Sequence, residues 1–165
     1  YGSCIEEWSE IKMTNTLYRE YRFKFYLNAS HYIVINGKEG QLHPHTWEFM
    51  VDILMNSKDF VQFDAYEKAI DAYFEKYQNH VINEIPPFDH TVPTLENMAD
   101  YFIYDIRDIV EKLDGVLVKM ECSETPTRSY IISFEKDQGF IDNIRAQSKD
   151  KIDAVIDSVI NSIIE

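Results

Sequence analysis

The chain has 165 residues, of which 45% are hydrophobic, enough for one domain with a real core. Its net charge of -13 would repel phosphate groups, which argues against nucleic acid or an anionic membrane as a general partner. Two distant cysteines, Cys4 and Cys122, fit a reduced, cytoplasmic protein, and no apolar run approaches the length of a membrane span.

Two segments in the first third of the chain alternate between apolar and polar residues, which predicts half-buried strands. They cover residues 17–34 and 43–55, and the stretch between them, with two glycines, reads as a loop. The face with the large apolar residues also carries histidine in both strands. Its members are Tyr21, Phe23, Phe25, Leu27, Ala29 and His31 in the first, and His43, His45, Trp47, Phe49, Val51 and Ile53 in the second.

The pattern then becomes helical over residues 63–82, where apolar residues recur at spacings of three and four. A proline-rich stretch, 83–93, interrupts it. A second helix follows, with Thr94 as its N-cap and Gly115 after its end.

Residues 116–122 and 129–134 read as two further strands, joined across "SETPTR". From residue 138 onward an Ile/Val stripe predicts a third amphipathic helix. The order of strand, strand, helix, helix, strand, strand and helix predicts an α+β fold.

The histidines are the first candidates for chemistry. His43 and His45 are two apart, so both imidazoles leave one face of their strand, and an antiparallel partner would bring His31 across from them. An H-x-H pair alone is more often structural. The third histidine favours a metal site, because three neutral imidazoles with an open position are the catalytic zinc arrangement. His80 and His90 have no such partners.

Five stretches together resemble the 6-pyruvoyl-tetrahydropterin synthase and 6-carboxytetrahydropterin synthase family. They are "FYLNASH", "LHPHTW", "NEIPPF", "PTLENMADYF" and "SETPTRSY", in the family's order and roughly its spacing. The resemblance implies the T-fold, a ββααββ unit with a four-stranded antiparallel sheet and two helices on one face. Residues 17–136 would form this domain, 1–16 an N-terminal extension and 137–165 an extra C-terminal helix.

The resemblance also implies a site and an assembly. His31, His43 and His45 would bind Zn²⁺, and Glu124 would anchor a pterin substrate by accepting hydrogen bonds from its ring. Thr94 and Thr125 would border the pterin pocket. Family members form trimers or hexamers, with active sites between subunits, so a homo-oligomer is expected.

The chain departs from the family where protons are moved. Glu39 stands four residues before His43, in the place of the family's catalytic cysteine, and is a candidate general base. Alignment without gaps puts Gln78 and Asn79 where the family has Asp and His; a slip of one residue would bring in His80. A solvated loop residue is the alternative for Glu39.

Three functions are compatible with these observations. The first is a zinc-dependent lyase acting on the side chain of dihydroneopterin or its triphosphate. The second is a zinc-containing pterin- or purine-binding protein that has lost the standard catalytic relay. The third, which the sequence favours least, is a zinc hydrolase that uses a zinc-bound hydroxide. The sequence leaves the pathway open among folate, biopterin and queuosine biosynthesis.

Overall fold

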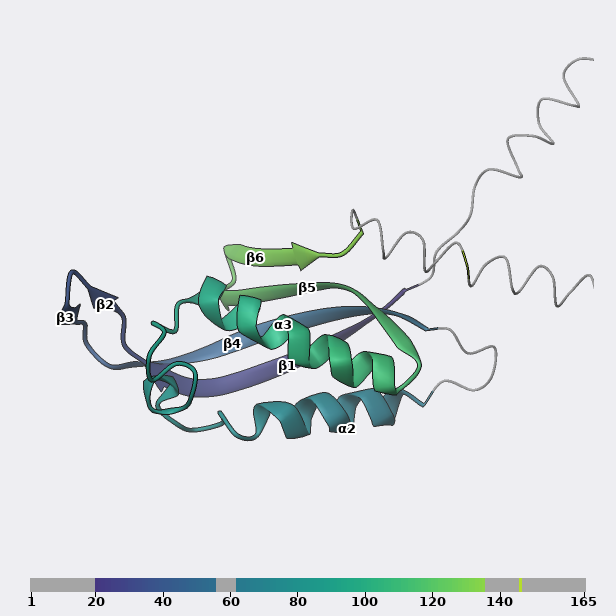
Figure 1. Cartoon of the computed structure of the whole chain (residues 1–165), viewed down its shortest axis with the longest axis horizontal. Coiled ribbons are helices and arrows are strands. Elements are labelled where there is room, and N and C mark those ends of the chain that lie inside the picture. The colour runs from purple at the N-terminus through teal and green to yellow at the C-terminus, as the bar shows by residue number, and fades with distance from the viewer. Residues whose placement is uncertain (1–19, 56–61, 136–145, 147–165) are drawn as a thin grey trace, which may run out of the picture.

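The computed structural model describes residues 20–55, 62–135 and 146, so the predicted N-terminal extension and C-terminal helix lie outside the described residues, except for residue 146. Four antiparallel strands form one sheet in the order β1-β4-β5-β6. They are β1 (Glu20–His31), β4 (His43–Met55), β5 (Gly115–Thr125) and β6 (Arg128–Ser133). Two helices, α2 (Phe63–Phe74) and α3 (Leu95–Lys112), cover one face of the sheet (Figure 1).

This architecture confirms the predicted α+β class and the ββααββ order. The core lies between the sheet and the helices, where apolar strand residues such as Trp47 and Phe49 meet apolar helix residues such as Phe74 and Phe102. All four side chains are buried. Neither α2 nor α3, nor any other helix in the described part of the chain, has the length and apolarity of a membrane span.

The start of α3 is as predicted, but its end differs. The Thr94 hydroxyl accepts a hydrogen bond from the Asn97 amide at 3.2 Å, so Thr94 is the N-cap. Asp114, with φ of 60°, takes the left-handed position after the helix. Gly115 instead begins β5, where an added Cβ would lie 2.9 Å from the Tyr66 hydroxyl. The glycine is therefore required by close packing and not by the helix end.

The first helix is shorter than predicted, since α2 ends at Phe74 and not at residue 82. The chain then leaves the helix to run beside β1, and the Asn79 amide donates to the Asn28 carbonyl at 2.6 Å. Asn79 has φ of 60°, which breaks the helical path. A short 3₁₀ helix, η1 (Ile82–Glu84), follows.

The predicted loop between the first two strands contains a small hairpin, β2 (Val34–Ile35) and β3 (Lys38–Glu39). Its two turn residues, Asn36 and Gly37, have φ of 53° and 73°. Positive φ at both positions is the type I′ arrangement, for which Asn-Gly is the preferred sequence. The hairpin extends beyond the end of the sheet where β1 finishes and β4 begins (Figure 1).

The face of the sheet opposite the helices carries a buried charge, Asp52. Arg22 donates to its two carboxylate oxygens at 2.7 and 2.9 Å, and Lys119 lies 3.2 Å away. Burial acts to raise the pKa of the Asp52 carboxyl, but these two cations outweigh it and hold the pKa below its usual value. The group therefore ties β4 to both neighbouring strands.

We expect Asp52→Asn to lower the free energy of unfolding by about 1–3 kcal/mol at neutral pH, because it removes charge-assisted hydrogen bonds. The carboxylate's stabilisation is complete above the unfolded pKa of about 4 and is lost as pH falls through the lower folded pKa. Urea unfolding at a series of pH values should therefore show the difference from wild type narrowing in acid.

Asp64→Asn is the control, since Asp64 makes an exposed ion pair with Lys68 one helical turn away. It should change stability little at any pH. A loss for Asp52→Asn that is the same in strong acid as at neutral pH would contradict the ionic explanation.

Candidate functional site

The three predicted histidines lie together at one end of the sheet's helix-covered face. In the antiparallel β1–β4 pair, His31 stands directly opposite His43, and Ala29 stands opposite His45. Since directly opposite residues share a face, all three imidazoles point to the same side. His31 is buried, with 2% of its surface exposed, and the other two are partly exposed.

Backbone carbonyls orient two of the rings. Nδ1 of His31 lies 2.7 Å from the Pro93 carbonyl, and Nδ1 of His43 lies 2.7 Å from the Gln41 carbonyl. A carbonyl only accepts, so each Nδ1 carries the hydrogen and each Nε2 keeps its lone pair. The Nε2 of His45 is buried and has no hydrogen-bond partner among the described residues.

These three groups fit a metal ion. Their ligand atoms all lie within 4.8 Å of one another, and the Nε2 atoms of His31 and His43 are 3.1 Å apart. Two lone pairs this close repel unless a proton or a cation lies between them. Burial lowers the pKa of His31 and of His45, which favours the neutral form that binds metal. Carbonyl acceptors behind two of the rings are the usual outer support of such a site.

Glu124 completes this cluster from the next strand. The pairing of β5 is irregular at two places. One lies opposite Asp52/Ile53 of β4, and the other, between Cys122 and Thr125, contains Glu124. Such bulges re-aim side chains. The Glu124 carboxylate, largely buried, lies 3.5 Å from Nε2 of His45 and 3.7 Å from Nε2 of His31.

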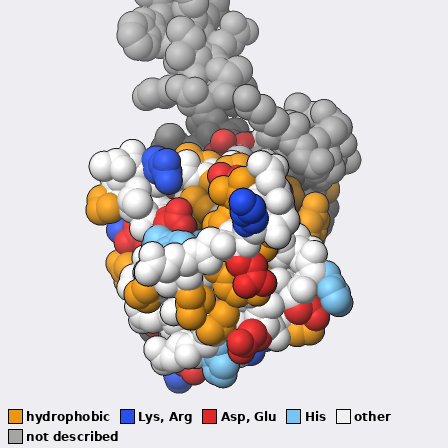
Figure 2. Space-filling view, turned by 90° about the vertical axis from the view of Figure 1, so that its left-hand side faces the viewer, with side chains coloured by type: hydrophobic (Ala, Val, Ile, Leu, Met, Phe, Trp, Pro, Cys, Tyr) orange, Lys and Arg blue, Asp and Glu red, His pale blue; other side chains and the backbone are white. Residues whose placement is uncertain are grey.

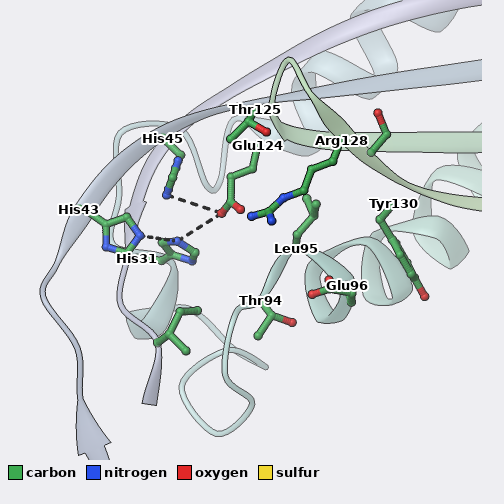
Figure 3. A pocket seen from close by; sticks show the side chains of 12 residues that line it. His31, His43, His45, Thr94, Leu95, Glu96, Glu124, Thr125, Arg128 and Tyr130 are labelled. Carbon is green, nitrogen blue, oxygen red and sulfur yellow. Dashed lines mark hydrogen bonds and ion pairs between the residues drawn. The ribbon is translucent and has the colours of Figure 1, made fainter. Parts of the chain in front are cut away.

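The histidines and Glu124 line a cavity of about 530 Å³, which suits a small-molecule ligand. Thr94 and the first residues of α3 form one wall, and the strand ends at the β5–β6 turn form the opposite one (Figure 3). Thr125 ends β5 and Arg128 begins β6 on either side of this turn. The end of the molecule that bears the β2–β3 hairpin shows acidic, basic and histidine side chains among apolar ones (Figure 2).

Comparison with known families decides the relationship. The sequence pattern of the family described as 6-pyruvoyl tetrahydropterin synthase matches residues 20–135, which is more than half of the chain. The chain belongs to this family. A comparison with curated proteins gave no match.

Solved structures of the family share the fold at low sequence identity. The Caenorhabditis elegans 6-pyruvoyl tetrahydropterin synthase matches with a TM-score of 0.60 and 16% identity, over 73% of this chain and 99% of that one. The Plasmodium falciparum enzyme gives 0.55 and 15%, over 71% and 98%. A Plasmodium vivax enzyme with alanine in place of a catalytic glutamate gives 0.54 and 13%, over 71% and 98%.

Two predicted site residues lie outside the cavity lining of the single chain. Glu39 is exposed on β3 and pairs with Val34. His80 is also exposed, and its Nδ1 donates to the Gln78 carbonyl at 2.6 Å. Because α2 ends at Phe74, His80 does not lie at a helix end as the sequence had indicated.

Gln78 and Asn79 bind the free edge of β1. The Gln78 side chain donates to the Tyr26 carbonyl at 2.7 Å and accepts from the Asn28 amide at 2.9 Å, as a strand backbone would. The Ser30 amide next along β1 donates to the His80 carbonyl at 2.9 Å. Gln78 and Asn79 thus have a structural role at the edge of β1.

Sequence reasoning missed Arg128 as a cavity residue. Arg128 lies within "SETPTRSY", a stretch already singled out, four residues after Glu124. A bulge in β5 and the β5–β6 turn bring the side chains of Glu124 and Arg128 to the same wall of the cavity. Neither the bulge nor the turn has a recognisable sequence pattern. The alternation of side chains along β6 was the one usable signal, because Tyr130 and Ile132, which follow Arg128 at spacings of two, are partly buried against the core.

We expect the purified chain to retain about one Zn²⁺ per chain, the stoichiometry of a three-histidine site. His45→Ala should lose it, because two imidazoles bind a divalent ion far more weakly than three. Metal analysis after gel filtration measures this, and added Zn²⁺ should raise the melting temperature of the wild type but not of His45→Ala. His90→Ala is the control, since that side chain is 89% exposed and lies apart from the site. Equal zinc in the His45→Ala and wild-type proteins would contradict the assignment.

Proposed function

We propose that this chain is a zinc-dependent enzyme that acts on the side chain of dihydroneopterin or of its triphosphate. The observation that carries the proposal is the joining of three imidazoles and a carboxylate in one cavity of about 530 Å³, in a member of this family. The imidazoles offer a metal site, and the carboxylate offers an acceptor for the donor groups of a pterin ring.

Three nitrogen ligands with room for one more group are typical of catalytic zinc, so Zn²⁺ is the proposed ion. His31, His43 and His45 would hold it. When bound, zinc polarises substrate oxygens and makes protons on the neighbouring carbons more acidic.

Glu124 is the proposed anchor for the ring. A carboxylate accepts hydrogen bonds only, and the 2-amino and N3–H groups of a pterin are donors, so the two edges are complementary. Thr94 and Thr125 line the same cavity and would border the ring. In the structure the Glu124 carboxylate lies against the histidines, so ring binding between them requires rotation of this side chain.

Glu39 is the proposed general base, which would accept a proton from a side-chain carbon of the substrate. A catalytic glutamate in the Plasmodium vivax relative supports a carboxylate in this role. His80 is the second candidate for proton transfer. Its Nδ1–H is held by a carbonyl, so its Nε2 is a free acceptor.

Glu39 and His80 lie outside the cavity lining of one chain, so the proposal places the complete active site between subunits of a homo-oligomer. Each edge of the sheet offers backbone groups for such contacts: β6 over Arg128–Ser133, and β1 over Glu20–Phe25. Ile131 on β6 is 55% exposed, as a residue covered by another subunit would be. The protein is proposed to work in the cytoplasm, because two cysteines far apart in the sequence do not suggest a disulfide scaffold.

The alternative is a zinc-containing pterin- or purine-binding protein without the standard relay. The observation that favours it is the engagement of Gln78: its amide cannot ionise, and it is hydrogen-bonded to β1. Binding of a ring would then persist without turnover.

Incubation with dihydroneopterin and with its triphosphate, followed by fluorescence of the pterin products, separates the two functions. We expect turnover of at least one substrate. Glu39→Gln should lower kcat by about 100-fold or more, as loss of a general base does, while zinc content stays unchanged.

Glu67→Gln, on the exposed face of α2, is the matched control and should leave kcat unchanged. Full activity in Glu39→Gln would remove Glu39 from the mechanism. Tight pterin binding without any turnover by the wild type would favour the binding protein instead.

A further inference from the structure

Every strand of the sheet contributes a polar side chain to the same end of its helix-covered face. The residues, from one edge of the sheet to the other, are His31, His43 with His45, Glu124, and Arg128. The first four have roles in the proposed function, and Arg128 of β6 has none so far.

The register of β6 fixes the direction of Arg128. Tyr130 pairs with Cys122, which is buried beneath the helices, so Tyr130 shares that face. Tyr130 and Ile132 both pack against the core. Arg128 precedes Tyr130 by two residues and therefore leaves the strand on the same face.

Arg128 reaches into the cavity next to Glu124. Figure 3 shows its guanidinium end directed toward the Glu124 carboxylate, on the side away from the histidines. Of the described residues that line the cavity, Arg128 is the only Lys or Arg. It forms no ion pair or hydrogen bond with another residue of the cavity wall as drawn (Figure 3), so its donors face the cavity.

A carboxylate beside a guanidinium is an acceptor beside a donor. A 2-amino-4-oxopyrimidine edge presents the complementary order: the amino group and N3–H donate, and the neighbouring 4-oxo group accepts. A neutral 2,4-diamino ring offers an amino donor in place of that oxygen and a lone pair in place of N3–H. It would therefore meet the donors of Arg128 with another donor, and Glu124 would keep only the 2-amino group as a donor.

We propose that Arg128 is a specificity residue that donates to the 4-oxo group of the bound ring while Glu124 accepts from its amino and N3–H groups. The inference rests on the proposed function, since it assumes that the cavity holds a pterin. It assigns to the Glu124–Arg128 pair the selection of 4-oxo over 4-amino rings.

The position of Arg128 favours the ring edge over a phosphate group as its partner. The amino-oxo edge and the substrate's side chain lie at opposite ends of the bicyclic ring. A ligand whose side chain reaches His31, His43 and His45 therefore presents the edge away from the histidines, on the side of Arg128 (Figure 3). Glu124 meets the same edge once its side chain has rotated away from the histidines, which it contacts in the structure. A triphosphate on that side chain would be held at the histidine end.

The test compares pterin and 2,4-diaminopteridine, which differ at the 4-position and, with it, in whether N3 carries a hydrogen, by fluorescence titration of the zinc-loaded protein near neutral pH. We expect the wild type to prefer pterin by about 10-fold or more, the value of one charge-assisted hydrogen bond. Arg128→Met should weaken pterin binding by about 10-fold and leave 2,4-diaminopteridine nearly unchanged, so the preference falls by about that factor, and what remains is the preference of Glu124 for N3–H. Arg128→Lys keeps the positive charge but loses the planar guanidinium with its paired N–H donors, and it should retain part of the preference.

Lys68→Met is the matched control, because it removes an exposed cation on α2, and it should keep the wild-type preference. Melting temperatures check that each variant folds. A preference unchanged in Arg128→Met and Arg128→Lys, or an equal loss for both rings, would overturn the role of Arg128 alone. Failure of the wild type to bind either ring would overturn this role and the proposed function together.

Discussion

The antiparallel register of β1 and β4 is the constraint on which the site depends. It runs without interruption from Glu20 opposite Leu54 to His31 opposite His43. Because side chains alternate faces, a slip of one residue would move His43 and His45 to the outer face and expose the core residues with them. The apolar residues that build the core therefore also fix the imidazoles, and the site gains its precision from the hydrophobic effect.

The two faces of the sheet hold this register by different means. On the covered face, Trp47 and Phe49 are fully buried directly beyond the histidines. On the open face, Asp52 joins Arg22 of β1 and Lys119 of β5 through ionic hydrogen bonds. Core packing holds the strands against the helices, and the ion pairs hold β1, β4 and β5 in register with one another. The strand ends that carry the histidines, Glu124 and Arg128 are therefore parts of rigid elements, as a preorganised site requires.

Local patterns predicted much of this structure, while long-range contacts decided the rest. Alternation alone placed the three histidines on one face, and Thr94 was recognisable as a helix cap. The end of α2 was not predictable, because Gln78 bonds to backbone groups some fifty residues earlier in the chain. The apolar spacing continued past Phe74 and gave no stop signal. Arg128 was missed for a similar reason: its place in the cavity depends on a bulge in the neighbouring strand.

The hydrogen bonds along the edge of β1 also bear on how the protein avoids aggregation. A free strand edge is a template for the addition of foreign strands. Gln78 and Asn83 meet the backbone of Tyr26, Asn28 and Tyr32 with their side-chain amides, and this half of the edge is closed. The other half carries Arg22 and Lys24, whose charges discourage a second copy from adding in parallel alignment. The amide of Gln78 thus closes a stretch of strand edge to which a foreign strand could otherwise add.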